Sequence, residues 1–170
     1  PVFLGNGDLA WLAMEHAGFE ADRFRIKLRS GNTVREVAPQ WDRSVQHLEV
    51  ARDGRTLLAT ASDLGQTPLF AVEVKSGRVS PVSGPGHVAQ FSPARQGNVV
   101  LWHDLATPPD FYLLSPNGSQ RRLTNVNAEL LAARSLGTFE QFNFKGWNDE
   151  TVHGYLVNPP GYSATGKYPI

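Results

Sequence analysis

Glycine-containing turns divide most of this 170-residue chain into three units of about forty residues. Within each unit, apolar runs of strand length alternate with turn signals, which indicates four short β-strands. A tight turn precedes the fourth run of every unit, and the glycines of these turns are 46 and 41 residues apart: Gly31, Gly77 and Gly118. Four-stranded units at this period are typical of the blades of a β-propeller.

The middle unit shows the pattern most clearly. The run 68–75 alternates Leu, Ala and Glu with Phe, Val and Val, as a half-buried strand does. Asp53-Gly54 is a hairpin-turn signal between the first two runs of this unit. The expected strands of the middle unit are 48–52, 56–62, 68–75 and 78–82. The first unit is expected to form strands 2–4, 9–14, 23–29 and 33–38, and the third 88–92, 98–103, 110–115 and 120–124.

An antiparallel β-sandwich is the alternative to a propeller, because it too has many short strands with regular turns. The constant position of the turn before each fourth strand favours the repeat. The fold class expected from the sequence is therefore all-β, with about three propeller blades.

Charge and composition exclude several classes of function. Sixteen basic and sixteen acidic side chains cancel and are scattered, so we expect neither nucleic acid nor a membrane as a partner. No apolar run approaches the eighteen residues of a membrane span, and no basic n-region of a signal peptide precedes Val2-Phe3-Leu4.

The chain offers no metal-binding motif. It has no cysteine, which excludes disulfides and thiolate ligands. The five histidines lack the spacing of a zinc site, so they are interpreted as structural or surface residues: His16, His47, His87, His103 and His153. No metal, nucleotide or redox cofactor is expected.

The order of strands predicts which loops carry function. In a four-stranded blade, the second-to-third loops and the links between blades lie on one face, and the short turns lie on the other. The first set holds the longer and chemically more varied segments, at 15–22, 39–44, 63–67 and 104–109. Because functional residues concentrate on loops of a rigid scaffold, we expect the site on this face.

Two clusters on this face are candidates for binding a peptide substrate. The first is Glu20, Asp22 and Arg23, where a carboxylate can bind an α-amino group and the guanidinium can bind a carbonyl or carboxylate. The alternative is that the three residues form an ion-pair network that holds their loop. The second cluster is Trp41 and Arg43; the alternative there is a tryptophan that packs between blades beside a solvent-facing arginine.

The last third of the chain has a different rhythm. Residues 139–145 and 152–157 are expected to form a hairpin around a turn at 146–149, and a further strand is expected to begin at 167–170. The run FEQFNFKGWNDETVHGYLVNPPGYSATGKYPI resembles the start of the catalytic domain of prolyl oligopeptidase-family serine peptidases. The preceding NVNAELLAARSLGTFEQF resembles the junction of propeller and catalytic domain in the acylaminoacyl- and dipeptidyl-peptidase branch. GFEADRFRI and WDRSVQHLEVARDGRTLLATASDLGQTPLF resemble the same branch.

The resemblance implies a division into residues 1–136, the three C-terminal blades of a propeller, and residues 137–170, the truncated start of an α/β-hydrolase domain. It implies a serine peptidase for short peptides, with a Ser-Asp-His triad and a G-x-S-x-G nucleophile motif. The chain has no G-x-S-x-G sequence, so we expect it to be inactive alone, with the propeller gating the substrate. Its expected partners are a peptide substrate and the remainder of its own chain; since three blades cannot close a ring, self-association is also expected. The alternative function is a non-catalytic propeller that binds other proteins.

Overall fold

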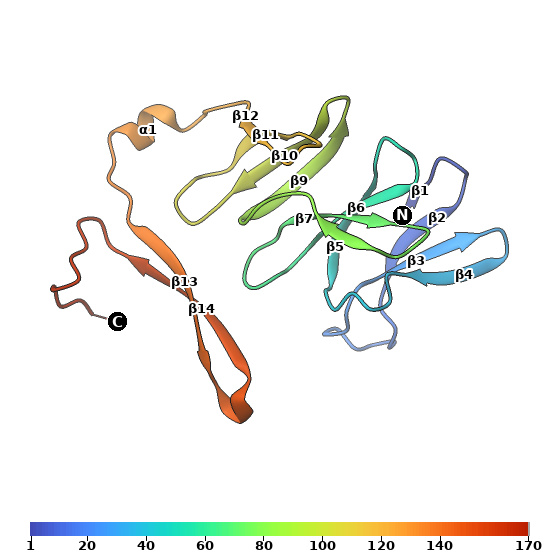
Figure 1. Cartoon of the computed structure of the whole chain (residues 1–170), viewed down its shortest axis with the longest axis horizontal. Helices are drawn as coiled ribbons and strands as arrows, with labels where there is room; N and C mark the ends of the chain where they lie inside the picture. Colours follow the sequence, from blue (N-terminus) through green and yellow to red (C-terminus); the bar gives the residue numbers. More distant parts are fainter. Residues whose placement is uncertain (170) are drawn as a thin grey trace.

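The computed structural model describes residues 1–169 and contains three four-stranded sheets followed by a two-stranded hairpin (Figure 1). In each four-stranded sheet the strands lie side by side in chain order, and all neighbours are antiparallel. The first sheet consists of β1 (Val2–Phe3), β2 (Leu9–Ala13), β3 (Arg25–Ser30) and β4 (Thr33–Val37). The second consists of β5 (Val45–Val50), β6 (Thr56–Ala61), β7 (Leu69–Glu73) and β8 (Val79–Pro81). The third consists of β9 (His87–Ala94), β10 (Gly97–His103), β11 (Asp110–Leu114) and β12 (Gln120–Arg122).

This arrangement confirms three propeller blades and rules out the sandwich for the described residues. The strands lie within a few residues of the expected runs. One larger difference is β5, which begins at Val45 rather than Leu48, because a register shift between Val45 and His47 interrupts the alternation of side chains.

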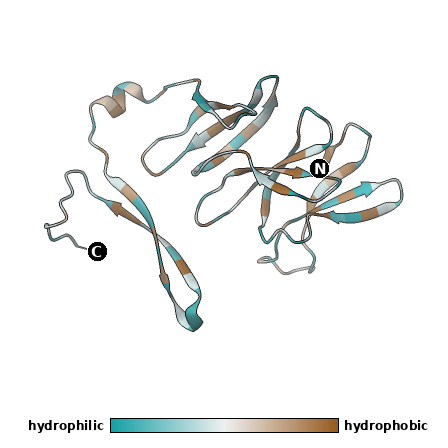
Figure 2. Ribbon diagram, in the orientation of Figure 1, coloured by the Kyte–Doolittle hydropathy of each residue, from teal (hydrophilic) through white to brown (hydrophobic). Residues whose placement is uncertain are grey.

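The core lies between blades. In β6, Leu57 and Ala59 point into a cluster shared with the first blade, whereas Leu58 points into a cluster shared with the third. Residues one apart in a strand face opposite sides of the sheet, so the middle blade buries both faces. Figure 2 shows the corresponding apolar bands across the central strands.

The segment that leaves the third blade is anchored to Asp110. Asp110 at the start of β11 is fully buried, and its carboxylate accepts hydrogen bonds from Thr124 Oγ1 and from the guanidinium of Arg122. The backbone N–H of Val126 donates to the same carboxylate. These bonds hold the segment that leaves the blade against β11, and they lower the pKa of Asp110, with the Thr124 hydrogen bond as the largest cause.

A short helix, α1 (Ala128–Ala132), connects the third blade to the hairpin of β13 (Thr138–Lys145) and β14 (Thr151–Asn158). The sequence Ala-Glu-Leu-Leu-Ala has high helix propensity, but at five residues the helix is too short to leave an amphipathic pattern, and it was not predicted. The hairpin itself is confirmed, and its turn is the 3₁₀ segment η1 (Trp147–Asp149). Residues 167–169 form no strand, and Ile170 lies outside the described residues.

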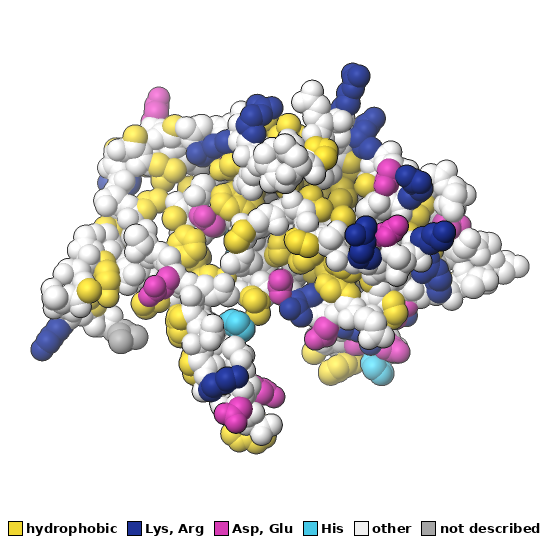
Figure 3. Space-filling model, in the orientation of Figure 1, with side chains coloured by type: hydrophobic (Ala, Val, Ile, Leu, Met, Phe, Trp, Pro, Cys, Tyr) yellow, Lys and Arg dark blue, Asp and Glu magenta, His cyan; other side chains and the backbone are white. Residues whose placement is uncertain are grey.

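Large apolar side chains are exposed on the third blade and on the hairpin. Figure 3 shows hydrophobic side chains gathered over the region between the blades and the hairpin, with Lys and Arg mostly over the blades. Exposed apolar residues in these regions include Leu105, Phe111, Val126, Phe144, Trp147 and Val157. Among residues 1–169, no helix has the length and hydropathy needed to cross a lipid bilayer.

Candidate functional site

The structure separates the short turns from the longer loops, as expected for blades. In Figure 1 the β2–β3, β6–β7 and β10–β11 loops extend toward the lower left, the side on which the hairpin lies, and the short turns extend away from it. Among residues 1–169, hydrogen bonds join the β6–β7 loop directly to the hairpin. The face that sequence reasoning singled out is thus the face that meets the hairpin.

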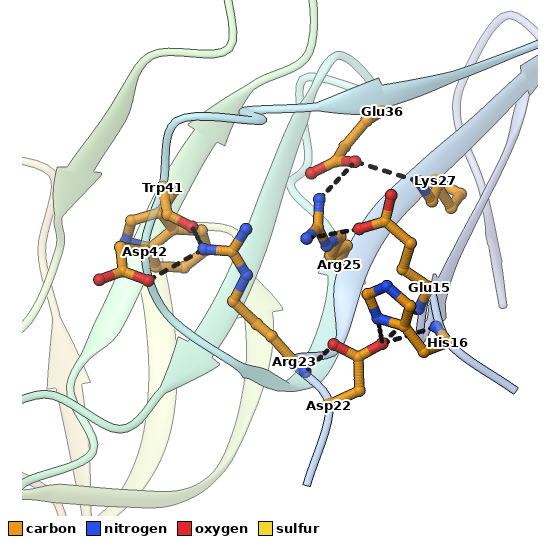
Figure 4. A network of polar contacts seen from close by, with 9 residues as sticks. All are labelled: Glu15, His16, Asp22, Arg23, Arg25, Lys27, Glu36, Trp41 and Asp42. Carbon is orange, nitrogen blue, oxygen red and sulfur yellow. Dashed lines mark hydrogen bonds and ion pairs between the residues drawn. The ribbon is translucent and has the colours of Figure 1, made fainter. Parts of the chain in front are cut away.

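Asp22 is occupied by its own loop. Its Oδ2 accepts from the backbone N–H of His16 at 2.8 Å and of Glu15 at 2.7 Å, and its Oδ1 accepts from the N–H of Arg23 at 2.8 Å (Figure 4). These bonds outweigh burial, with the His16 N–H as the largest cause, and lower the pKa of Asp22 from 3.8 to about 2. The carboxylate closes the β2–β3 loop on itself.

Arg23 brings the two predicted clusters together. Its Nη1 donates to the backbone oxygen of Trp41 at 3.0 Å and to Oδ1 of Asp42 at 3.1 Å (Figure 4). The Trp41 ring packs edge-on against Phe70 of the middle blade, with ring centroids 5.1 Å apart. Trp41 thus packs between the first two blades, and Arg23 fixes the β2–β3 loop to the link 38–44.

Arg25 is the centre of an adjacent network that sequence reasoning missed. Its guanidinium contacts Glu15 at 2.6 Å and Glu36 at 3.4 Å, and Lys27 contacts Glu36 at 3.0 Å (Figure 4). Burial opposes the ionisation of Glu36, but the hydrogen bond and charge of Lys27, reinforced by Arg25, outweigh it, so the pKa of Glu36 lies below its ordinary value. Lys27 and Glu36 lie directly opposite each other on β3 and β4. This cross-strand charge pair can be recognised in the sequence only when the register of the two strands is known.

Glu20 stands apart from both networks. Its side chain is exposed, and no ion pair or hydrogen bond found among residues 1–169 uses its carboxylate. The hollow lined by Arg23, Trp41 and Arg43 has a volume of about 10 Å³, the space of one water. The two clusters therefore form a packed wall without a ligand-sized cavity, and Glu20 is exposed on the same loop as Asp22.

The side chain of Arg43 is about a third exposed, but its guanidinium is not free in solvent. Its Nε and Nη2 both donate to Oδ1 of Asp63, at 2.9 and 2.8 Å, so this arginine is tied to the β6–β7 loop. The aspartate lies twenty residues away in sequence, in the next blade, and the sequence carries no local sign of this pairing.

A pocket of about 230 Å³ lies where the blades meet the hairpin. Its walls are mostly apolar, and the titratable side chains in them are His87, Asp104 and Tyr155. The lining residues are Gly65, Gln66, Pro85, Gly86, His87, Asp104, Leu105, Phe139, Tyr155 and Val157. The imidazole of His87 stacks on that of His103, its cross-strand partner, with centroids 5.0 Å apart. Burial, and then the charge of His103, lower the pKa of His87, against an opposing effect of Asp104. No group of three or more metal-ligating side chains occurs in the part of the chain that the structure describes.

Comparison with curated proteins gives matches along the whole chain. Dipeptidyl-peptidase 5 of Aspergillus fumigatus is 29% identical over 181 residues, and the match covers 100% of this chain and 25% of that protein. Dipeptidyl-peptidase 5 of Porphyromonas gingivalis is 26% identical over 175 residues, covering 99% of this chain and 25% of the relative. The chain therefore spans about a quarter of the length of these relatives. No protein-family model matches it.

Solved structures share the fold. An acylaminoacyl peptidase in complex with Z-Gly-Gly-Phe-chloromethyl ketone superposes with a TM-score of 0.77 at 18% identity, over 95% of this chain and 25% of the other. The isopeptidase AtxE2 gives a TM-score of 0.79 at 13% identity, over 99% of this chain and 26% of the other. The β-propeller domain of the trilobed protease from Pyrococcus furiosus gives 0.59 at 16% identity, over 75% of this chain and 38% of the other. The last match confirms that the four-stranded sheets are propeller blades.

Proposed function

We propose that the complete protein is a serine peptidase that cleaves short peptides, since this chain belongs to the prolyl oligopeptidase family, in the branch of the dipeptidyl- and acylaminoacyl-peptidases. Within it, residues 1–136 are propeller blades, and residues 137–170 begin the catalytic domain. The observation that carries the proposal is the match of blades, junction and hairpin, in one order and over the full chain, to dipeptidyl-peptidase 5 proteins.

The role proposed for the blades is to admit and orient the peptide. The support is geometric, because the β2–β3 and β6–β7 loops and the hairpin lie on one side of the blades (Figure 1). Loops carried by a rigid scaffold and facing a second domain can restrict what enters between the two. The chemistry itself belongs to residues outside this chain, because the chain contains no G-x-S-x-G sequence.

On the blades, the proposed substrate-contacting group is Glu20, with Arg23 and the Trp41–Arg43 segment as the wall behind it. Glu20 is the exposed carboxylate of this wall whose oxygens remain available, whereas both oxygens of Asp22 accept backbone hydrogen bonds. An exposed carboxylate binds the α-ammonium group of a peptide by a charge-assisted hydrogen bond. Asp22 then contributes by fixing the loop that presents Glu20.

The proposal is tested by the sequence that follows Ile170 and by labelling of the full-length protein with a fluorophosphonate. We expect a His-Gly-Gly segment, then a G-x-S-x-G motif whose serine takes up the label. Further blades or a stop codon directly after Ile170, or a folded full-length protein that takes up no label, would contradict the peptidase and favour the protein-binding propeller.

A further inference from the structure

The β6–β7 loop of the middle blade contains a strained two-residue turn at Leu64 and Gly65. The backbone N–H of Asp63 donates to the oxygen of Gln66 at 2.9 Å, and the N–H of Gln66 donates back to Asp63 at 3.0 Å. Between them Leu64 has φ of 49° and Gly65 has φ of 78°, the left-handed pair of a type I′ turn. Leucine rarely adopts this conformation, so contacts around the turn must hold it there.

Those contacts come from the hairpin. The carbonyl oxygen of Leu64 accepts a hydrogen bond from Tyr155 Oη of β14 at 3.1 Å and another from Gln141 Nε2 of β13 at 3.2 Å. A β-carbon added at Gly65 would lie 2.8 Å from the Tyr155 ring, so the ring rests directly on the glycine. The turn therefore fits the hairpin in shape as well as in hydrogen bonding.

Gln66 extends this contact to the third blade. Its Nε2 donates to Tyr155 Oη at 2.8 Å, and its Oε1 accepts from the N–H of Gly86 at 2.8 Å. Gly86 belongs to the link between the second and third blades. One glutamine thus joins the hairpin, the middle blade and the link that follows it.

Among residues 1–169, the hydrogen bonds of Tyr155 and Gln141 are the ones that join the hairpin to the blades. The contact consists of three hydrogen bonds and the packing of the Tyr155 ring on Gly65, and the loss of one such bond shifts its equilibrium about two- to tenfold. The base of the turn is connected to the candidate site. Asp63 at this base binds Arg43, which follows Trp41 and Asp42 in the chain.

We propose that the Leu64–Gly65 turn and Tyr155 form a reversible latch, which sets the position of the substrate-facing loops of the blades against the domain that the hairpin begins. Tyr155 is a positioning residue in this scheme, because it acts through the turn. The latch rests on the proposed function for its consequence in catalysis. Its structural part stands on the contacts of Tyr155, Gln141 and Gly65.

The test measures a distance in the full-length protein. Residues 1–170 contain no cysteine, so Arg52→Cys in the β5–β6 turn and Asn143→Cys in β13 give two exposed positions for spin labels, after any accessible cysteine elsewhere in the protein has been replaced. We expect one narrow distance distribution in the parent. Tyr155→Phe should increase the population at other distances about two- to tenfold, and Gly65→Ala should shift the main distance.

Tyr162→Phe is the matched control, because Tyr162 stacks on Tyr168 and donates to no group in the described residues. Should Tyr155→Phe reduce the folded yield, Gln141→Leu removes the other bond to Leu64 and gives the same readout. Distributions that stay unchanged in Tyr155→Phe, Gly65→Ala and Gln141→Leu alike would overturn the latch.

Kinetics separate the two proposals. If the full-length protein hydrolyses peptides, Tyr155→Phe should change KM about two- to tenfold at an unchanged Tm, whereas Tyr162→Phe should leave KM unchanged. An unchanged KM in Tyr155→Phe would overturn the effect of the latch on substrate entry. A parent without peptidase activity would contradict the proposed function, while the label distances would still decide the latch.

Discussion

Arg43 and Asp63 join the link between the first two blades to the loop of the middle blade, through two N–H donors on one carboxylate oxygen at 2.8 and 2.9 Å. About a third of each side chain is exposed, so solvent weakens the pair. We predict a coupling free energy of about 0.5–1 kcal/mol in a double-mutant cycle of Arg43→Ala and Asp63→Ala, measured by urea unfolding. Strictly additive effects would show that the pair does not connect the two segments.

Asp22 should make the stability of the blades depend on pH in acid. Its pKa is lowered in the folded state, so it stabilises the fold fully above about pH 4, and this contribution is lost as the pH falls through about 2. Urea unfolding of the parent should therefore show a steeper loss of stability between pH 4 and pH 2 than unfolding of Asp22→Asn. Equal slopes in this window would contradict the assigned hydrogen bonds.

Glu20 and Asp22 should separate substrate binding from stability in the full-length protein. Glu20→Ala should raise KM for peptides with a free N-terminus about tenfold at unchanged Tm, because its carboxylate makes no hydrogen bond or ion pair among residues 1–169. Asp22→Ala should lower Tm, because three backbone N–H groups lose their acceptor. If Glu20→Ala instead lowers Tm and leaves KM unchanged, Glu20 stabilises its loop and does not bind substrate.

The 170-residue chain alone should self-associate through the outer face of the third blade. Phe111 of β11 is 45% exposed and Val126, in the segment that follows β12, is 79% exposed; burying such side chains stabilises a contact by about 1.5–3 kcal/mol each. In sedimentation velocity, Phe111→Ser with Val126→Ser should shift the chain toward monomer, and Phe142→Ser on the hairpin should have a smaller effect. If the unsubstituted 170-residue chain stays monomeric at all concentrations, the prediction of an open, self-associating outer face is contradicted.

The strands and the blade order could be predicted because turn and strand signals are local. The period of the turns ending at Gly31, Gly77 and Gly118 reports the repeat directly. The helix α1 was not predicted, because five residues are too few to show an amphipathic pattern. The early start of β5 was not predicted either, because the register shift interrupts the alternation of inward and outward side chains.

The pairings of the site could not be predicted in the same way. Arg43 with Asp63 and Tyr155 with Leu64 join residues 20 and 91 positions apart, on loops whose approach depends on how blades and hairpin pack. Sequence reasoning placed Glu20, Asp22 and Arg23 on one loop, but only the structure shows that Asp22 and Arg23 are used by hydrogen bonds within the blades. Whether those residues bind substrate stays a prediction.

The most direct test of the account is mass spectrometry of peptides with free N-termini after incubation with the full-length protein, beside residues 1–170 alone. We predict that the full-length protein releases N-terminal dipeptides and that residues 1–170 release nothing. A folded full-length protein that leaves these peptides intact would contradict the account.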